Sequence, residues 1–141
     1  MKNLDLKVFN FPSIFEEKKQ GTLRVFELEK VPFQVKRVFT VVNALGGSVR
    51  GQHAHKECNQ LLCCVAGKVN LLCDDGTNKI EILLDSQGHS ILIPNGIWAE
   101  QKYITDNSVL IVFCDRGYDE SDYIREYSKF LAWTIKQKKG Y

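Results

Sequence analysis

Two histidines spaced two apart, inside a run bounded by glycines, are the feature that most constrains this chain. The run extends from Gly47 to Gly67 and contains His53 and His55. Residues two apart lie on the same face of a strand, so both imidazoles are expected on one side of a sheet. An imidazole changes its charge near neutral pH, which suits such a pair to moving protons. A lone histidine on a strand is usually an ordinary polar residue, but this spacing favours a functional pair.

The spacing of these glycines and histidines resembles the first motif of the cupins, with Gln60 where that motif has a glutamate. A second cupin-like segment runs from Gly88 to Ala99, and Ala99 stands where the pattern has a third metal-binding histidine. Two imidazoles and one amide oxygen make a poor site for a tightly held divalent ion. The resemblance therefore predicts a cupin-type barrel with no metal and no other cofactor.

Short apolar or alternating runs, separated by turns rich in glycine, aspartate and asparagine, fill most of the chain. Asp74-Asp75-Gly76 is a strong hairpin signal between two of them. This pattern is typical of an all-β sandwich or barrel and agrees with a jelly roll. Strands are expected near residues 4–11, 22–28, 33–42, 53–55, 60–66, 68–73, 79–84, 90–93, 98–103 and 109–114.

The apolar period changes near the C-terminus. Tyr123, Tyr127 and Phe130 lie roughly on helical spacing, and Ser121 or Asp122 is a suitable N-cap. We expect a C-terminal α-helix over about residues 122–136, packed on the outside of the barrel. With no linker or repeat in between, residues 1–141 are expected to form a single cupin domain.

Composition excludes several function classes. The formal net charge is +2, which gives no case for nucleic-acid binding, and no apolar stretch is long enough to span a membrane. Five cysteines, an odd number without a Cys-x-x-Cys pair, indicate reduced thiols. The first residues lack the long apolar region of a signal peptide. A cytoplasmic protein is expected.

Several segments together identify a family. They are Lys36-Arg-Val-Phe39, Arg50-Gly-Gln-His-Ala-His-Lys56, Asp74-Asp-Gly76, Pro94-Asn-Gly-Ile-Trp98 and Tyr118-Asp-Glu-Ser-Asp-Tyr-Ile-Arg-Glu-Tyr127. From about residue 5 to 133 the chain resembles sugar 3,4-ketoisomerases that act on a dTDP-4-keto-6-deoxyhexose. The resemblance implies a metal-free homodimer. The molecule that it binds would be a dTDP-linked keto-deoxysugar. It implies formation of a dTDP-3-keto-6-deoxyhexose, in deoxyamino-sugar biosynthesis for surface polysaccharide.

The chemistry of that reaction assigns roles to the residues. Moving a ketone from C4 to C3 requires an acid and a base, and His53 and His55 are the catalytic candidates. The sequence leaves open which of them is the base. The diphosphate requires cations, and guanidinium matches phosphate oxygens, so Arg50 and Arg37 are the candidates. Arg37 on an otherwise apolar strand face is equally consistent with a side chain that reaches out to solvent.

Three further side chains are expected at the substrate, namely Gln60, Trp98 and Glu100. For Trp98, a role as a core aromatic is at least as well supported by the sequence. The N-terminal strand near residues 4–11 is the expected exchanged or bridging element of the dimer, because small barrels of this type cover their edges by pairing.

The chain departs from better-known members of the family at Ala99, Thr40 and Gln20. These positions leave the C4 configuration of the product open. The first alternative function is a sugar-nucleotide-binding cupin whose catalysis is weakened by the changes at Ala99 and Thr40. The second is a metal-dependent cupin enzyme, against which the residues at positions 60 and 99 count.

Overall fold

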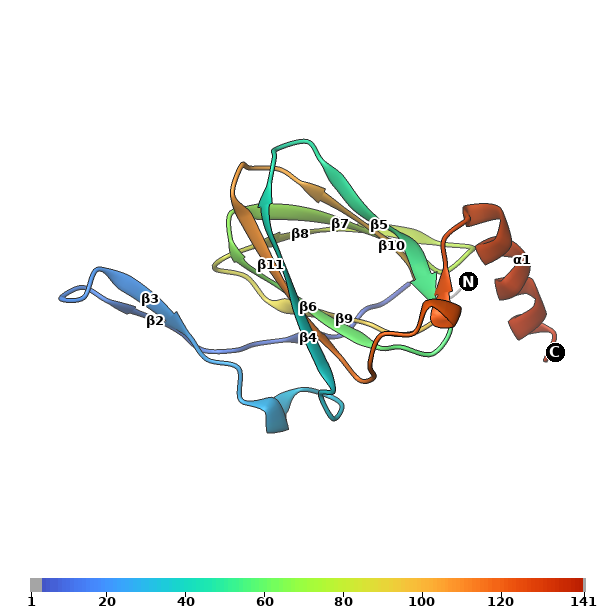
Figure 1. Cartoon of the computed structure of the whole chain (residues 1–141), viewed down its shortest axis with the longest axis horizontal. Coiled ribbons are helices and arrows are strands. Elements are labelled where there is room, and N and C mark those ends of the chain that lie inside the picture. Colours follow the sequence, from blue (N-terminus) through green and yellow to red (C-terminus); the bar gives the residue numbers. More distant parts are fainter. Residues whose placement is uncertain (1–3, 141) are drawn as a thin grey trace.

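Two antiparallel sheets packed face to face form the body of the molecule, in a computed structural model that describes residues 4–140 (Figure 1). One sheet has the strand order β1-β9-β6-β11-β4, and the other has the order β12-β5-β10-β7-β8. In chain order the elements are β1 (Val8–Phe9), β2 (Ser13–Glu16), β3 (Gly21–Arg24), the 3-10 helix η1 (Leu28–Lys30), β4 (Arg37–Ala44), β5 (Val49–His55), β6 (Gln60–Ala66), β7 (Lys68–Asp74), β8 (Lys79–Asp85), β9 (Ser90–Ile93), β10 (Trp98–Tyr103), β11 (Ser108–Cys114), the 3-10 helix η2 (Glu120–Asp122), β12 (Tyr123–Ile124) and α1 (Tyr127–Lys138). The predicted all-β jelly roll with a C-terminal helix is confirmed.

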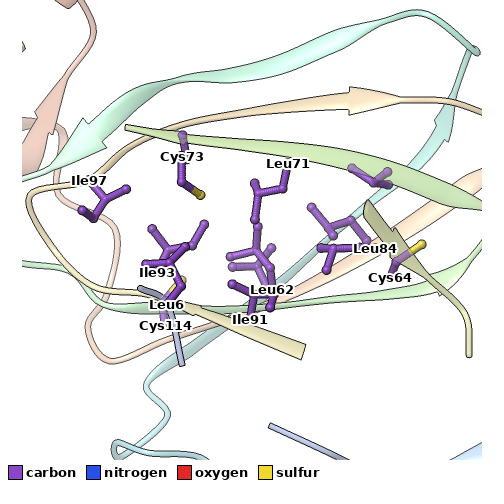
Figure 2. Packing of buried hydrophobic residues seen from close by; sticks show 14 of the residues in the cluster. Leu6, Leu62, Cys64, Leu71, Cys73, Leu84, Ile91, Ile93, Ile97 and Cys114 are labelled. Carbon is purple, nitrogen blue, oxygen red and sulfur yellow. The ribbon is translucent and has the colours of Figure 1, made fainter. Parts of the chain in front are cut away.

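The main core lies between the two sheets, where the inward residues of each strand meet. Figure 2 shows Leu62 of β6 and Leu71 of β7 pointing towards one another, and both are fully buried. Strand β6 is apolar on both faces because its outward residue Leu61 is covered by Phe11 and Val31 of the N-terminal segment. The other strands bury one face, which gives them the alternating pattern seen in the sequence.

The N-terminal segment differs from expectation. Residues 4–11 contribute only the short strand β1, which pairs with β9 of the same chain. The strand expected at 33–42 begins at Arg37, and β2 was not expected. Strands β2 and β3 form a separate hairpin that projects from the body (Figure 1).

The predicted start of the C-terminal helix is wrong. Residues 120–122 form η2, whose N-cap is Asp119, since its side chain accepts a hydrogen bond from the Ser121 N–H. Tyr123 and Ile124 then pair with β5 as strand β12, and α1 begins only at Tyr127. The helix lies on the outer face of its sheet, as predicted, with Phe130 buried in a small second cluster. Tyr123 and Ile124 are therefore extended, because pairing with β5 outweighs the helical spacing of the aromatic residues.

The two sheets share one core, and the single cupin domain stays a prediction. The predicted domain, 1–141, includes residues 1–3 and 141, which lie outside the described residues. Between residues 4 and 140, none of the helices has the length and apolarity needed to cross a bilayer.

Candidate active site

The two histidines of β5 lie side by side. The ring centroids of His53 and His55 are 5.0 Å apart and the rings are nearly perpendicular. Between them Ala54 points to the opposite face, where it packs in the cluster beneath α1. The ring of Tyr123 lies against both imidazoles, at 5.0 Å from His53 and 4.4 Å from His55. The shared face predicted from the two-residue spacing is confirmed.

A β-bulge in β5 brings Arg50 to the face of the histidines. Ala99 of β10 pairs with His53, and Gln101, two residues on, pairs with Arg50, so the extra residue lies in β5. Gly51 and Gln52 both have positive φ, at 83° and 58°. A bulge of this kind reverses the alternation of the strand. Without it Arg50, three residues before His53, would point away from the site.

Asp122 holds His55 in place. The His55 Nδ1 donates a hydrogen bond to Asp122 Oδ2 at 2.8 Å, and both side chains are buried. The other carboxylate oxygen, Oδ1, accepts the backbone N–H of Glu57 at 2.7 Å. Nε2 of His55 is buried and has no partner within residues 4–140. Burial lowers the pKa of His55, although the hydrogen bond with Asp122 acts in the opposite direction.

His53 is also held in a neutral state. Its Nδ1 lies 3.0 Å from the carbonyl oxygen of Gly51, which can only accept, so Nδ1 carries the proton and Nε2 a lone pair. Burial, followed by the nearby charge of His55, lowers the pKa of His53 to about 4. At neutral pH the site therefore holds two uncharged imidazoles, each with a basic Nε2.

The predicted residues Arg37 of β4 and Gln60 of β6 lie at the barrel interior, on the two strands that flank β11. Both donate to the sulfur of Cys114, from Arg37 Nη2 at 3.6 Å and from Gln60 Nε2 at 3.5 Å. The Arg37 guanidinium also lies near the rings of Phe39 and Tyr118, and its charge lowers the pKa of His55. The Arg37 side chain therefore lies close enough to His55 for its charge to act on the imidazole, and it does not extend only into solvent.

The structure does not bring Trp98 and Glu100 to the histidines, so these two residues are not part of the histidine site, and their contact with the substrate stays a prediction. On β10 they alternate with Ala99, which faces His53, so they lie on the outer face of the sheet. Trp98 packs against Phe130 of α1 at a ring distance of 5.7 Å. Glu100 and Trp98 line a shallow pocket there together with Tyr127. The core role of Trp98 is the one observed.

The donor set does not fit the metal site of a typical cupin, because the amide of Gln60 points a donor at Cys114 and Ala99 offers no ligand. Among residues 4–140, one group of three side chains is close enough to share an ion, namely His55, Cys58 and Asp122. The facing atoms of His55 and Asp122 are already joined by a hydrogen bond. The expectation of a metal-free site stays a prediction.

Sequence reasoning missed Asp122 and its neighbours. Arg125 lies over the ring of Tyr123 at 4.3 Å and forms an ion pair with Glu120, which places both charges near His53. The segment containing them was recognised as characteristic of the family, but its polar residues were interpreted as a helix start. No local pattern links Asp122 to a histidine 67 positions earlier.

Comparisons with known proteins agree with this geometry. Residues 4–135 match the FdtA family, described as WxcM-like, C-terminal. A TDP-4-oxo-6-deoxy-alpha-D-glucose-3,4-oxoisomerase of Aneurinibacillus thermoaerophilus is 35% identical over 134 residues, which cover 94% of this chain and 95% of that protein. Among solved structures, a 3,4-ketoisomerase from Helicobacter canadensis superposes with a TM-score of 0.85 at 30% identity, covering 94% of this chain and 99% of that one.

A sugar 3,4-ketoisomerase from Thermoanaerobacterium thermosaccharolyticum, solved in complex with TDP, superposes with a TM-score of 0.84 at 29% identity. The match covers 94% of this chain and 96% of that one. The family match and the curated relative both extend over nearly the whole chain. This chain therefore belongs to the FdtA family.

Proposed function

We propose that this chain is a sugar 3,4-ketoisomerase that converts TDP-4-keto-6-deoxy-D-glucose to a TDP-3-keto-6-deoxyhexose. The observation that carries the proposal is the pair of neutral imidazoles, of which one is backed by a buried carboxylate. The relative from Aneurinibacillus is a 3,4-oxoisomerase of this sugar, and a mutant of the Thermoanaerobacterium enzyme was solved in complex with TDP-4-keto-6-deoxyglucose.

His55 is proposed as the base at C3. Its Nε2 is unpartnered and basic, and Asp122 stabilises the imidazolium that forms when the C3 proton arrives. Loss of that proton converts the 4-ketone to an enediolate, whose negative charge is stabilised by nearby cations such as Arg37. Return of the proton from the His55 imidazolium to C4 completes the carbon part of the isomerisation.

His53 is proposed to move the hydroxyl proton. The 3-hydroxyl must lose its proton and the oxygen at C4 must gain one, so that the ketone ends at C3. With Nδ1–H fixed on the Gly51 carbonyl, Nε2 of His53 is free to accept the proton from O3 and pass it to O4. A conjugate acid with a pKa of about 4 releases the proton readily.

Arg50 is proposed to bind the diphosphate of the nucleotide. The bulge at Gly51 turns Arg50 to the same face as the histidines, and its side chain is exposed at the rim beside Val41 and Val49. An exposed guanidinium there can meet two phosphate oxygens at once. Arg37, which lies beside His55, would support binding closer to the reacting carbons.

The function is tested by incubating the purified protein with TDP-4-keto-6-deoxyglucose and following the sugar by NMR. The proposal predicts a 3-keto product, formed equally well after treatment with a chelator. Binding of TDP without any product would instead favour a sugar-nucleotide-binding cupin. Activity that disappears on metal removal and returns only on metal addition would favour a metal-dependent enzyme.

A homodimer is proposed as the working assembly. The projecting hairpin of β2 and β3 exposes Ile14, Phe15 and Leu23, each at least half exposed, and a second copy is a suitable cover for them. This hairpin replaces the segment 4–11 as the expected bridging element. Light scattering at micromolar concentration should give the mass of two chains, and a strictly monomeric protein would contradict the proposal.

A cytoplasmic location is proposed from the cysteines. All five are free and buried, and no pair within residues 4–140 forms a disulfide. This is the pattern of a protein from a reducing compartment. The role in deoxyamino-sugar biosynthesis for surface polysaccharide stays a prediction.

A further inference from the structure

Three polar side chains form a row across neighbouring strands at the barrel interior. In the register of the sheet, Cys114 of β11 is paired with Arg37 of β4 on one side and with Gln60 of β6 on the other. Directly opposed residues point to the same face of a sheet. The central position of the row is Cys114, which is completely buried, and Figure 2 shows it at one end of the core.

The sulfur of Cys114 accepts hydrogen bonds from several directions. Gln60 Nε2 lies at 3.5 Å and Arg37 Nη2 at 3.6 Å from this sulfur. The buried thiol of Cys58, which donates to the carbonyl oxygen of Asn59, also influences it. The neighbouring Cys58 thiol and the bonds from Gln60 and Arg37 lower the pKa of the Cys114 thiol, although burial alone would raise it. The Arg37 guanidinium therefore stabilises negative charge on the Cys114 sulfur.

The other buried cysteines behave differently, so burial alone does not explain Cys114. Cys73 lies in the same core with no polar partner among residues 4–140, and burial raises its pKa to about 12. That is the behaviour expected of a cysteine that acts as a small apolar residue. Cys73 is thus a matched reference for Cys114, with the same residue type and the same exposure.

We propose that Cys114 is a positioning residue of the isomerase reaction, whose buried sulfur anchors the Arg37 guanidinium beside His55. The proposal rests on the proposed function. With Nη2 bonded to the sulfur, the guanidinium lies near the ring of Tyr118. It also interacts electrostatically with His55 and Tyr123. Its Nε is buried without a partner in the described part of the chain, which leaves a donor for an oxygen of the bound sugar.

Anchoring of the Arg37 guanidinium affects the rate of the reaction. A guanidinium fixed next to the base stabilises negative charge on the sugar only as that charge develops, so its placement affects turnover more than binding. Cys114→Ser retains a small acceptor, but its Cβ–O bond is shorter than the Cβ–S bond, so the acceptor lies farther from Arg37, and its hydroxyl stays neutral. Arg37 would then be held loosely in the site.

The first test compares Cys114→Ser with the matched control Cys73→Ser. We expect Cys114→Ser to lower kcat roughly 10- to 100-fold, as for a misplaced catalytic group, with KM changed less than about threefold. Cys73→Ser should keep the wild-type kcat. An unchanged kcat in Cys114→Ser, with active wild-type protein, would overturn this proposal alone. Inactive wild-type protein would instead overturn the proposed function.

The second test does not depend on the folding of a Cys114 variant. The ultraviolet absorbance of a thiolate is followed against pH in the folded wild-type protein and in Arg37→Gln. In Arg37→Gln the same band should appear only at higher pH, because the counter-ion and one donor are removed. A thiolate band that appears at the same pH in the wild type and in Arg37→Gln would contradict the proposal.

A double-mutant cycle tests whether Cys114 acts through Arg37. If it does, Cys114→Ser should cost little further turnover once Arg37→Gln is present. The losses of the two single variants should therefore not multiply. Fully multiplicative losses would show that Cys114 affects the site by another route and would overturn the anchoring role.

Discussion

His55 and Asp122 are joined by a 2.8 Å hydrogen bond between two buried side chains that stand 67 residues apart in the chain. The bond fixes the imidazole with its proton on Nδ1 and leaves Nε2 as the basic atom at the reacting centre. The same carboxylate accepts the Glu57 backbone N–H, which limits its rotation. The base proposed for C3 thus depends on a residue of η2, outside the strand that carries the histidines.

Asp122→Asn should lower kcat by about two orders of magnitude, because the amide cannot stabilise the imidazolium as a carboxylate does. It should also move the acid limb of kcat/KM to lower pH, since Asp122 raises the pKa of His55. The control is Asp119→Asn, which alters the cap of the same 3-10 helix without a bond to His55. Equal losses in both variants would indicate a structural effect of η2.

The stability of the fold should decrease as the pH falls below 6.5. The pKa of His53 is about 4 in the folded protein and about 6.5 when exposed, so the unfolded chain binds a proton that the folded chain does not. The loss grows between pH 6.5 and 4 and amounts to on the order of 3 kcal/mol at its lower end. Urea unfolding at pH 7 and at pH 5 should show a smaller loss for His53→Asn than for the wild type. An identical loss in both proteins would exclude His53 as the source.

Gly51→Ala should destabilise the protein by about 1–3 kcal/mol and weaken nucleotide binding. The glycine has a φ of 83°, and a Cβ there would lie 2.9 Å from the Ala99 carbonyl oxygen. The matched control is Gly47→Ala, with a φ of 91° and no atom within 4 Å of the added Cβ. Gly47→Ala should show the backbone strain alone, without the effect on Arg50. Thermal unfolding measures the loss of stability, and titration with TDP measures the loss of nucleotide binding. Equal TDP affinities in Gly51→Ala and Gly47→Ala would argue that the bulge does not orient Arg50.

Arg50→Lys should weaken TDP binding by about 1–3 kcal/mol, because lysine cannot make the bidentate contact of a guanidinium. Arg116→Lys is the control, since the Arg116 guanidinium already forms ion pairs with Asp115 and Glu57 at the surface. Calorimetric titration with TDP provides the measurement. An unchanged affinity in Arg50→Lys would remove Arg50 from the nucleotide site.

The sequence predicted those parts of the site that follow from regular strand geometry. His53 and His55 share a face because they are two apart, and the turn signals located most of the strands. Arg50 was predicted from its chemistry as a phosphate ligand. It lies on the face of the histidines only because of a bulge in β5, which simple alternation does not reveal. Trp98 and Glu100 were expected at the substrate, but alternation along β10 places them on the face opposite to Ala99, away from the histidines.

Asp122 could not be found by local reasoning. It lies in a 3-10 turn followed by a two-residue strand, and its role arises only when that strand pairs with β5. The polar residues around it are equally good helix caps, so the helical spacing of the later aromatics extended the predicted helix too far. Tertiary pairing decided between two locally acceptable structures.

Proton exchange at C3 of the sugar tests the central claim most directly. TDP-4-keto-6-deoxyglucose is followed by NMR in deuterated buffer with wild-type protein, His53→Asn, His55→Asn and the exposed control His89→Asn. We predict a 3-keto product with the wild type and with His89→Asn, and turnover lower by about two to four orders of magnitude in both other variants. Slow deuterium uptake at C3 should persist in His53→Asn but be lost in His55→Asn. Wild-type turnover in both active-site variants, or C3 exchange that survives the loss of His55, would contradict the account.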